Sequence, residues 1–182
     1  MADLRRSRHI HANVVTVRAA PGDRSRATVS LGGITVLAAL GRSGRTAIKR
    51  EGDGATPIGN MRLLYGFVRR DRMRVLKTAL PMRRISWNML WCDQPTHPSY
   101  NRLVRAPCNQ SHEKMMRQDG LYDICLVLDW NITSRSRNRG SAIFFHLIRP
   151  GYKPTEGCIA VNYRDMQRLI RFMCRGTVVR VL

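Results

Sequence analysis

Two residues that can cooperate in catalysis, His146 and Cys158, stand close together in the sequence. His146 closes the apolar run SAIFFH, and Cys158 follows it by twelve residues, across the polar link LIRPGYKPTEG. A cysteine attacks as its thiolate, and a nearby imidazole can take the proton from the thiol. Gly157 lets the backbone approach a substrate closely and leaves amide groups to hold an oxyanion. The spacing favours a cysteine nucleophile; the alternative is a solvated strand-end histidine and an inert buried cysteine.

A second set of residues could bind a metal ion. Cys92, His97, Cys108 and His112 form the pattern Cys-x4-His-x10-Cys-x3-His. A structural zinc site prefers a tighter first pair such as Cys-x2-Cys, so zinc stays one alternative beside a Cys92–Cys108 disulfide and plain packing. The chain has five cysteines, an odd number, and no disulfide scaffold is indicated.

The elements that must position these residues are mostly strands. Runs rich in β-branched and aromatic residues predict strands at 14–17, 27–31, 34–40, 61–68, 124–130, 141–147 and 177–182. Gly32-Gly33 predicts a hairpin, because glycines accept the positive φ of a tight turn. The order of elements lacks the β–α–β alternation of a parallel sheet. We therefore expect a mainly antiparallel β domain.

Two segments are predicted as helices that cover this sheet. Residues 164–174 have apolar side chains at helical spacing, with Asn162 as N-cap and Gly176 after the end. Residues 111–116 could form a shorter helix that Ser111 caps. Residues 88–110 are predicted to be a long irregular segment, and 131–139 a polar, arginine-rich loop.

The composition is strongly basic, with a formal net charge of +20 over 182 residues. Such a charge attracts polyanions: nucleic acid, anionic lipid or an acidic polymer. The arginines are scattered, and no nucleic-acid-binding motif is present, so a dedicated nucleic-acid binder is not favoured. No apolar run reaches the length of a membrane span. Residues 1–11 are predicted to be a basic N-terminal tail, without the apolar core of a signal peptide.

Several blocks together resemble the L,D-transpeptidase catalytic domain (YkuD-type) family. GSAIFFHLIRP and PTEGCIAVNYRDMQRL resemble its His and Gly-Cys core, and GDGATPIG resembles its Thr-Pro-x-Gly turn. YNRLV, SHEKMMR and LYDICLVL are similar to segments of a bacterial branch with a PTEGC nucleophile motif. The resemblance covers residues 12–182 and implies one catalytic domain, an antiparallel β-sandwich or open barrel with one or two covering α-helices.

The resemblance also implies roles for the three core residues. Cys158 matches the nucleophile that becomes an acyl-thioester, and His146 matches the base that takes its proton and later serves the incoming amine. Gly157 matches the turn whose backbone N–H groups stabilise the oxyanion. In this family a backbone carbonyl usually orients the histidine, so no partner aspartate is required.

Two positions depart from the common Ser-His-Gly-Cys pattern of the family. Glu156 replaces the histidine, and Ala160 replaces an arginine that could anchor a substrate carboxylate. A carboxylate beside the thiol should raise its pKa, unless it points away or pairs with a cation. Candidate substrate-binding residues are therefore drawn from the branch segments and the link: His112, Glu113, Tyr122, Arg149, Thr155 and Glu156. Capping and strand-end roles are the alternative for His112, Glu113 and Tyr122.

These observations predict a peptidoglycan L,D-transpeptidase without metal or cofactor. The expected crosslinks are of the 3,3 or the L-Ala–diaminopimelate type. Alternatives are an L,D-carboxypeptidase or amidase on the same substrate, or a basic module that binds the wall or nucleic acid without catalysis. The resemblance implies stem peptides as donor and acceptor, carbapenems as acylating inhibitors, and a periplasmic or cell-envelope location. We expect a monomer.

Overall fold

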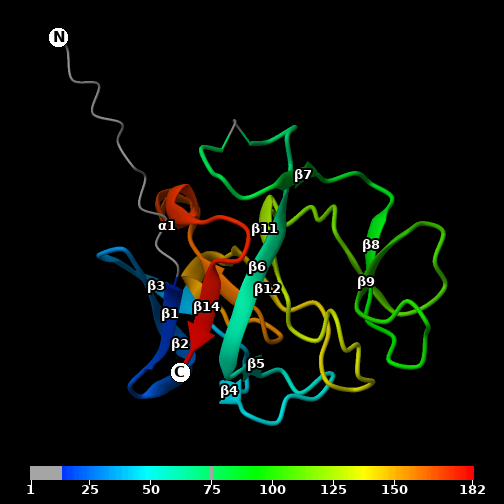
Figure 1. Cartoon of the computed structure of the whole chain (residues 1–182), viewed down its shortest axis with the longest axis horizontal. Coiled ribbons are helices and arrows are strands. Elements are labelled where there is room, and N and C mark those ends of the chain that lie inside the picture. Colours follow the sequence, from blue (N-terminus) through cyan, green and yellow to red (C-terminus); the bar gives the residue numbers. More distant parts are fainter. Residues whose placement is uncertain (1–13, 74–75) are drawn as a thin grey trace.

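The structure, a computed structural model, describes residues 14–73 and 76–182; the predicted basic tail, 1–11, lies outside the described residues. One sheet holds nine strands in the order β11-β12-β13-β3-β2-β1-β14-β6-β7 (Figure 1). Their bounds are β1 Val14–Ala20, β2 Asp23–Leu31, β3 Ile34–Ala39, β6 Gly59–Val68, β7 Met82–Arg84, β11 Ile124–Leu128, β12 Phe144–Leu147, β13 Ile159–Val161 and β14 Val178–Val181.

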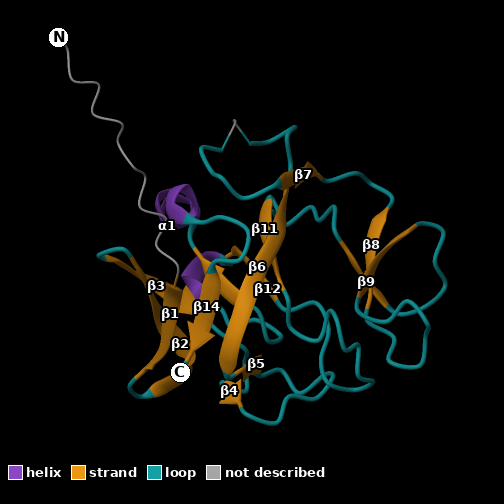
Figure 2. Cartoon of the chain, in the orientation of Figure 1, coloured by secondary structure: helices purple, strands orange, loops and turns teal. Residues whose placement is uncertain are grey.

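The sheet closes on itself because β11 also pairs with β6. Most strand pairs in it are antiparallel, and three are parallel: β1 with β14, β12 with β13, and β6 with β7. The strand β7 stands at the edge, outside the closed part. A two-stranded pair, β4 Arg45–Thr46 and β5 Thr56–Pro57, completes the region between β3 and β6. This architecture confirms the prediction of a mainly β fold of the barrel or sandwich type (Figure 2).

Alternating side chains build the core inside the barrel. Val15 and Val17 of β1 and Val29 of β2 are fully buried, and they share one cluster with Leu126 of β11. The predicted hairpin joins β2 to β3, with φ of 53° at Gly32 and 82° at Gly33. Alternation puts the other side chains of β11 on its opposite face, where they enter a second cluster. The strand β11 is therefore covered on both faces.

The predicted helix at 164–174 forms over a slightly different range. The helix α1 is Tyr163–Leu169, and a 3₁₀ turn, η2 Ile170–Phe172, continues it. Asn162 is the N-cap, and its side chain accepts a hydrogen bond from the Asp165 N–H. The apolar face enters the main core cluster through Met166, Leu169, Ile170 and Met173. A second 3₁₀ turn is η1 Pro150–Tyr152.

The helix predicted at 111–116 is wrong. His112–Lys114 is the strand β10, which pairs antiparallel with β8 Met89–Cys92; β8 in turn pairs with β9 Arg102–Arg105. This three-stranded sheet lies beside the barrel (Figure 1) and gives strands to the segment 88–110, which was predicted to be irregular. Backbone pairing across distant segments outweighed local capping propensity here. Among the described residues, no helix has the length and apolar character needed to cross a membrane.

Candidate active site

Cys158 and His146 come from adjacent strands of the barrel. Cys158 directly precedes β13, which runs parallel to β12, and His146 of β12 stands opposite Ala160 of β13. Because side chains two residues apart point to the same face of a strand, Cys158 and Ala160 share the face of His146. All three line one pocket of about 310 Å³. The polar link between the two strands thus brings the predicted pair together.

The turn before Cys158 requires glycine. Gly157 has a φ of 132°, and a Cβ there would lie 2.9 Å from the Ala55 carbonyl oxygen. The Gly157 N–H donates to Thr155 Oγ1 at 3.2 Å, and Thr155 Oγ1 donates to the Cys158 carbonyl at 2.7 Å. Thr56, from the Thr-Pro-x-Gly block, also donates to that carbonyl at 3.4 Å. The turn is therefore held by hydrogen bonds from Thr155 within it and from Thr56 of a distant segment.

The thiol of Cys158 contacts the segment that leads into β12. Its Sγ accepts the Phe144 N–H at 3.4 Å and donates to the Ala142 carbonyl at 3.2 Å. Burial raises the pKa of Cys158 to about 12, although the hydrogen bond from Phe144 acts in the opposite direction. Glu113 also raises this pKa, whereas Lys49 and Arg117 lower it. The thiol is neutral near pH 7.

The imidazole of His146 is neutral as well. Burial lowers its pKa to about 4, while the hydrogen bond to the Leu147 carbonyl acts to raise it. The Nδ1 atom lies 2.7 Å from that oxygen. A carbonyl can only accept, so Nδ1 carries the proton and Nε2 keeps a free lone pair. The Tyr122 ring meets the imidazole edge to face at 5.3 Å and limits its rotation.

A charged network lies next to this pair. Glu113 Oε2 accepts from Arg117 Nη1 at 3.3 Å and from the Tyr122 hydroxyl at 3.4 Å. Arg117 also forms a two-pronged pair with Asp119, at 2.9 and 2.6 Å. Burial raises the pKa of Tyr122 well above its usual value, so its hydroxyl remains a donor. Glu113 and Tyr122, two of the predicted substrate-binding residues, therefore meet at the pocket.

The other predicted residues divide between the pocket and the surface beyond it. Arg149, Thr155 and Glu156 line the pocket, but His112 lies outside its lining. The ring of His112 sits at hydrogen-bond distance from the Gln110 carbonyl, with 2.6 Å between Nδ1 and the oxygen. Alternation along β10 explains the separation of His112 from its neighbour Glu113.

Glu156 is directed away from the thiol and forms an ion pair with Arg42. Its side chain is 77% exposed, and it is not among the main causes of the raised pKa of Cys158. The carboxylate that raises this pKa is Glu113, which is distant in sequence. Ala160 contributes a small side chain to the lining.

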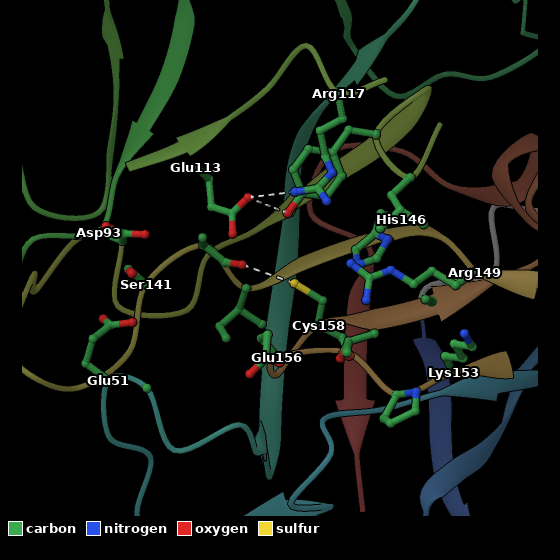
Figure 3. A pocket seen from close by; sticks show the side chains of 18 residues that line it. Glu51, Asp93, Glu113, Arg117, Ser141, His146, Arg149, Lys153, Glu156 and Cys158 are labelled. Atoms are coloured by element: carbon green, nitrogen blue, oxygen red, sulfur yellow. Dashed lines mark hydrogen bonds and ion pairs between the residues drawn. The ribbon is translucent and has the colours of Figure 1, made fainter. Parts of the chain in front are cut away.

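Several pocket residues were not singled out from the sequence: Glu51, Asp93, Arg117, Ser141 and Lys153. Figure 3 shows Glu51, Asp93 and Ser141 on one side of Cys158 and Arg149 and Lys153 on the other. Most of these lie beside blocks that did draw attention, such as GDGATPIG and SHEKMMR. The sequence therefore held a weak signal for them.

The alternative metal set does not gather around one point. In the ranges 14–73 and 76–182, no group of three or more His, Cys, Asp or Glu side chains is placed to hold a metal ion. Cys92 Sγ lies 3.7 Å from His97 Nδ1, and Cys92 and Cys108 are both free thiols. The Cys92–Cys108 disulfide is therefore absent from this structure.

A comparison with protein-family models found a match that spans most of the chain. The YkuD family model, described as the L,D-transpeptidase catalytic domain, matches residues 9–181. Comparisons with curated proteins and with solved structures found no match.

Proposed function

Because the chain belongs to the L,D-transpeptidase catalytic domain family, we propose that it forms peptidoglycan crosslinks through an acyl-thioester on Cys158. The observation that carries this proposal is the meeting of Cys158 and His146 in one pocket, on one face of adjacent parallel strands. The free lone pair of His146 Nε2 supplies the base that a neutral thiol needs. The proposed site of action is the cell envelope, where the polymer lies.

The first half-reaction forms the acyl-enzyme. The thiol of Cys158 turns from the Ala142 carbonyl towards His146, and Nε2 takes its proton as sulfur attacks the carbonyl carbon of the donor stem. The Leu147 carbonyl holds the imidazolium that results. The oxyanion is placed at the Gly157 turn, whose amide exchanges Thr155 Oγ1 for the substrate oxygen. His146 then gives the proton to the leaving amine as the donor C–N bond breaks.

The second half-reaction transfers the acyl group. The neutral amine of an acceptor stem attacks the thioester, and His146 removes its proton, so the sulfur leaves and regains a proton. Crosslinks of the 3,3 and of the L-Ala–diaminopimelate type both pass through an acyl-thioester on Cys158, but they differ in the donor bond that is cut and therefore in the acyl group that the sulfur carries. Water as acceptor gives the L,D-carboxypeptidase or amidase reaction instead.

The test is the incubation of purified muropeptides with the protein, followed by mass analysis of the products. We expect new dimers with the wild-type protein, and activity lower by at least about a thousandfold with Cys158→Ala. Cys174→Ala removes a half-exposed thiol outside the pocket and is the matched control, with activity near the wild type. Trimmed stems without dimers would favour the hydrolase. Equal, inert behaviour of the folded wild type and Cys158→Ala would leave the non-enzymatic binding module.

A further inference from the structure

The pocket contains more acidic side chains than the composition of the chain leads one to expect. Four of the 12 acidic residues line it: Glu51, Asp93, Glu113 and Glu156. Glu113 pairs with Arg117, and Glu156 pairs with Arg42. Neither Glu51 nor Asp93 forms an ion pair with a described residue. In a chain of net charge +20, two acidic side chains without a cationic partner at a pocket are unusual.

These two carboxylates lie with a buried serine at one end of the pocket, which we call the acid end. Figure 3 shows Glu51, Asp93 and Ser141 together there, on the opposite side of Cys158 from Arg149 and Lys153. Ser141 is 7% exposed. Its buried Oγ, like Asp93 Oδ1, has no hydrogen-bond partner among the described residues. Buried polar atoms without partners are costly, and a ligand that donates hydrogen bonds would satisfy them.

Among the described residues, one side-chain hydrogen bond reaches the acid end, and it comes from a tyrosine. The Tyr100 hydroxyl donates to Glu51 Oε2. Burial and then Glu51 raise the pKa of Tyr100, so this phenol keeps its proton. Ser141 also influences this pKa, but its Oγ makes no hydrogen bond of normal geometry. Tyr100 therefore orients Glu51 without neutralising its charge.

The opposite end of the pocket carries cations. Arg149 and Lys153 are exposed and line it, and neither forms an ion pair within the described parts of the chain. The charges that have no ion-pair partner among the described residues thus have opposite signs at the two ends, with Cys158 between them (Figure 3). A substrate that carries both an ammonium and a carboxylate group would be fixed in one direction.

We propose that the acid end binds the non-reacting primary ammonium group of the donor stem peptide, an inference that rests on the function proposed above. An ammonium has three donors, and Glu51, Asp93 and Ser141 offer three acceptor groups. Two carboxylates hold an amine in its protonated form, which is not nucleophilic. The bound group is therefore a recognition group of the donor rather than the amine that attacks the thioester.

The experiment compares two soluble donor stems, one with a free side-chain amine on its diamino acid and one with that amine acetylated. The substrate concentration for half-maximal acylation of Cys158 is measured by intact mass. In the wild type, acetylation raises this concentration about tenfold or more, because hydrogen bonds to charged groups are lost. In Asp93→Asn and Glu51→Gln this penalty falls to about threefold or less. Asp23→Asn removes one exposed charge outside the pocket and keeps the full penalty.

The proposal is wrong if acetylation of the donor amine does not raise the concentration for half-maximal acylation in the wild type. It is also wrong if acetylation raises this concentration equally in the wild type and in both pocket variants. The same comparison by calorimetry in a Cys158→Ala background measures stem binding without chemistry. If the wild type is never acylated, the proposed function fails, while calorimetry still decides the subsite. In calorimetry, acetylation of the donor amine should weaken stem binding to Cys158→Ala. If the added substitution Asp93→Asn removes this weakening, the ammonium subsite is supported; if the weakening is unchanged, the subsite is refuted.

Discussion

At the scale of single residues, burial sets the protonation states of the candidate catalytic pair. It raises the pKa of Cys158 to about 12 and lowers that of His146 to about 4. Between these values both groups are neutral, so the resting site holds a thiol and an imidazole rather than a thiolate–imidazolium pair. The proton must leave the thiol during attack, which makes the position of His146 Nε2 more important than the acidity of the cysteine.

This state predicts the pH dependence of alkylation at Cys158. Iodoacetamide reacts with the thiolate, so the rate should rise about tenfold per pH unit from about pH 7 to about pH 10, without a plateau. The direction follows from the raised pKa of Cys158, because each step in pH below that value increases the thiolate fraction in proportion. Peptide mass mapping separates Cys158 from the other four cysteines. A plateau near neutral pH would reveal a stable thiolate and contradict the neutral pair.

At the scale of elements, the Asn101 side chain ties together β8, the loop at Trp130 and Asn131, and the segment that leads into β12. Its Oδ1 accepts from Trp91 Nε1 at 3.0 Å and from the Ala142 N–H at 3.1 Å. Its Nδ2 donates to the carbonyls of Trp130, at 3.1 Å, and Asn131, at 2.9 Å. Ala142 has a φ of 50°, a region that a residue with a Cβ rarely adopts. Asn101 thus anchors, through the Ala142 N–H, the residue whose carbonyl accepts the hydrogen bond from the Cys158 thiol.

Replacing Asn101 with alanine is therefore expected to lower the free energy of unfolding by about 3 kcal/mol, because it leaves buried donors and acceptors without partners. Urea denaturation measures this change, and acylation should slow as Ala142 loses its anchor. Asn109→Ala, at an exposed position next to Cys108, is the control and should stay within about 0.5 kcal/mol of the wild type. If Asn101→Ala has a stability equal to that of the control, Asn101 does not position the segment.

The elements also show what the sequence could and could not predict. The strands with clear alternation and the helix capped by Asn162 were predictable, because local pattern and burial agree there. β10 was not, since His112–Lys114 is a strand only through pairing with β8. The neighbours of Cys158 in the pocket were unpredictable for the same reason, because they come from segments that are distant in the sequence. Glu113 raises the pKa of Cys158, whereas Glu156 pairs with Arg42, and only the fold distinguishes these two carboxylates.

At the scale of the whole molecule, acidic and basic side chains are distributed differently. The chain carries 32 lysines and arginines against 12 acidic residues, yet a third of the acidic residues line one pocket. The basic excess lies elsewhere, including the loop with the exposed Arg137 and Arg139. We therefore expect the surface to attract an anionic polymer over a long range, whereas in the proposed binding mode the pocket acts on charged groups in contact with it.

This difference between surface and pocket predicts that binding to the polymer and acylation of Cys158 depend differently on salt. Raising the salt from about 0.05 M to about 0.5 M shortens the screening length several-fold, so binding to intact peptidoglycan should fall by more than about tenfold. Acylation of Cys158 by a short soluble stem should change by only about threefold, because charges in contact in a partly buried pocket are screened less. Co-sedimentation with the polymer measures the first quantity, and intact mass measures the second. Equal salt dependence would mean that the pocket supplies most of the attraction and that the surface charge serves another role.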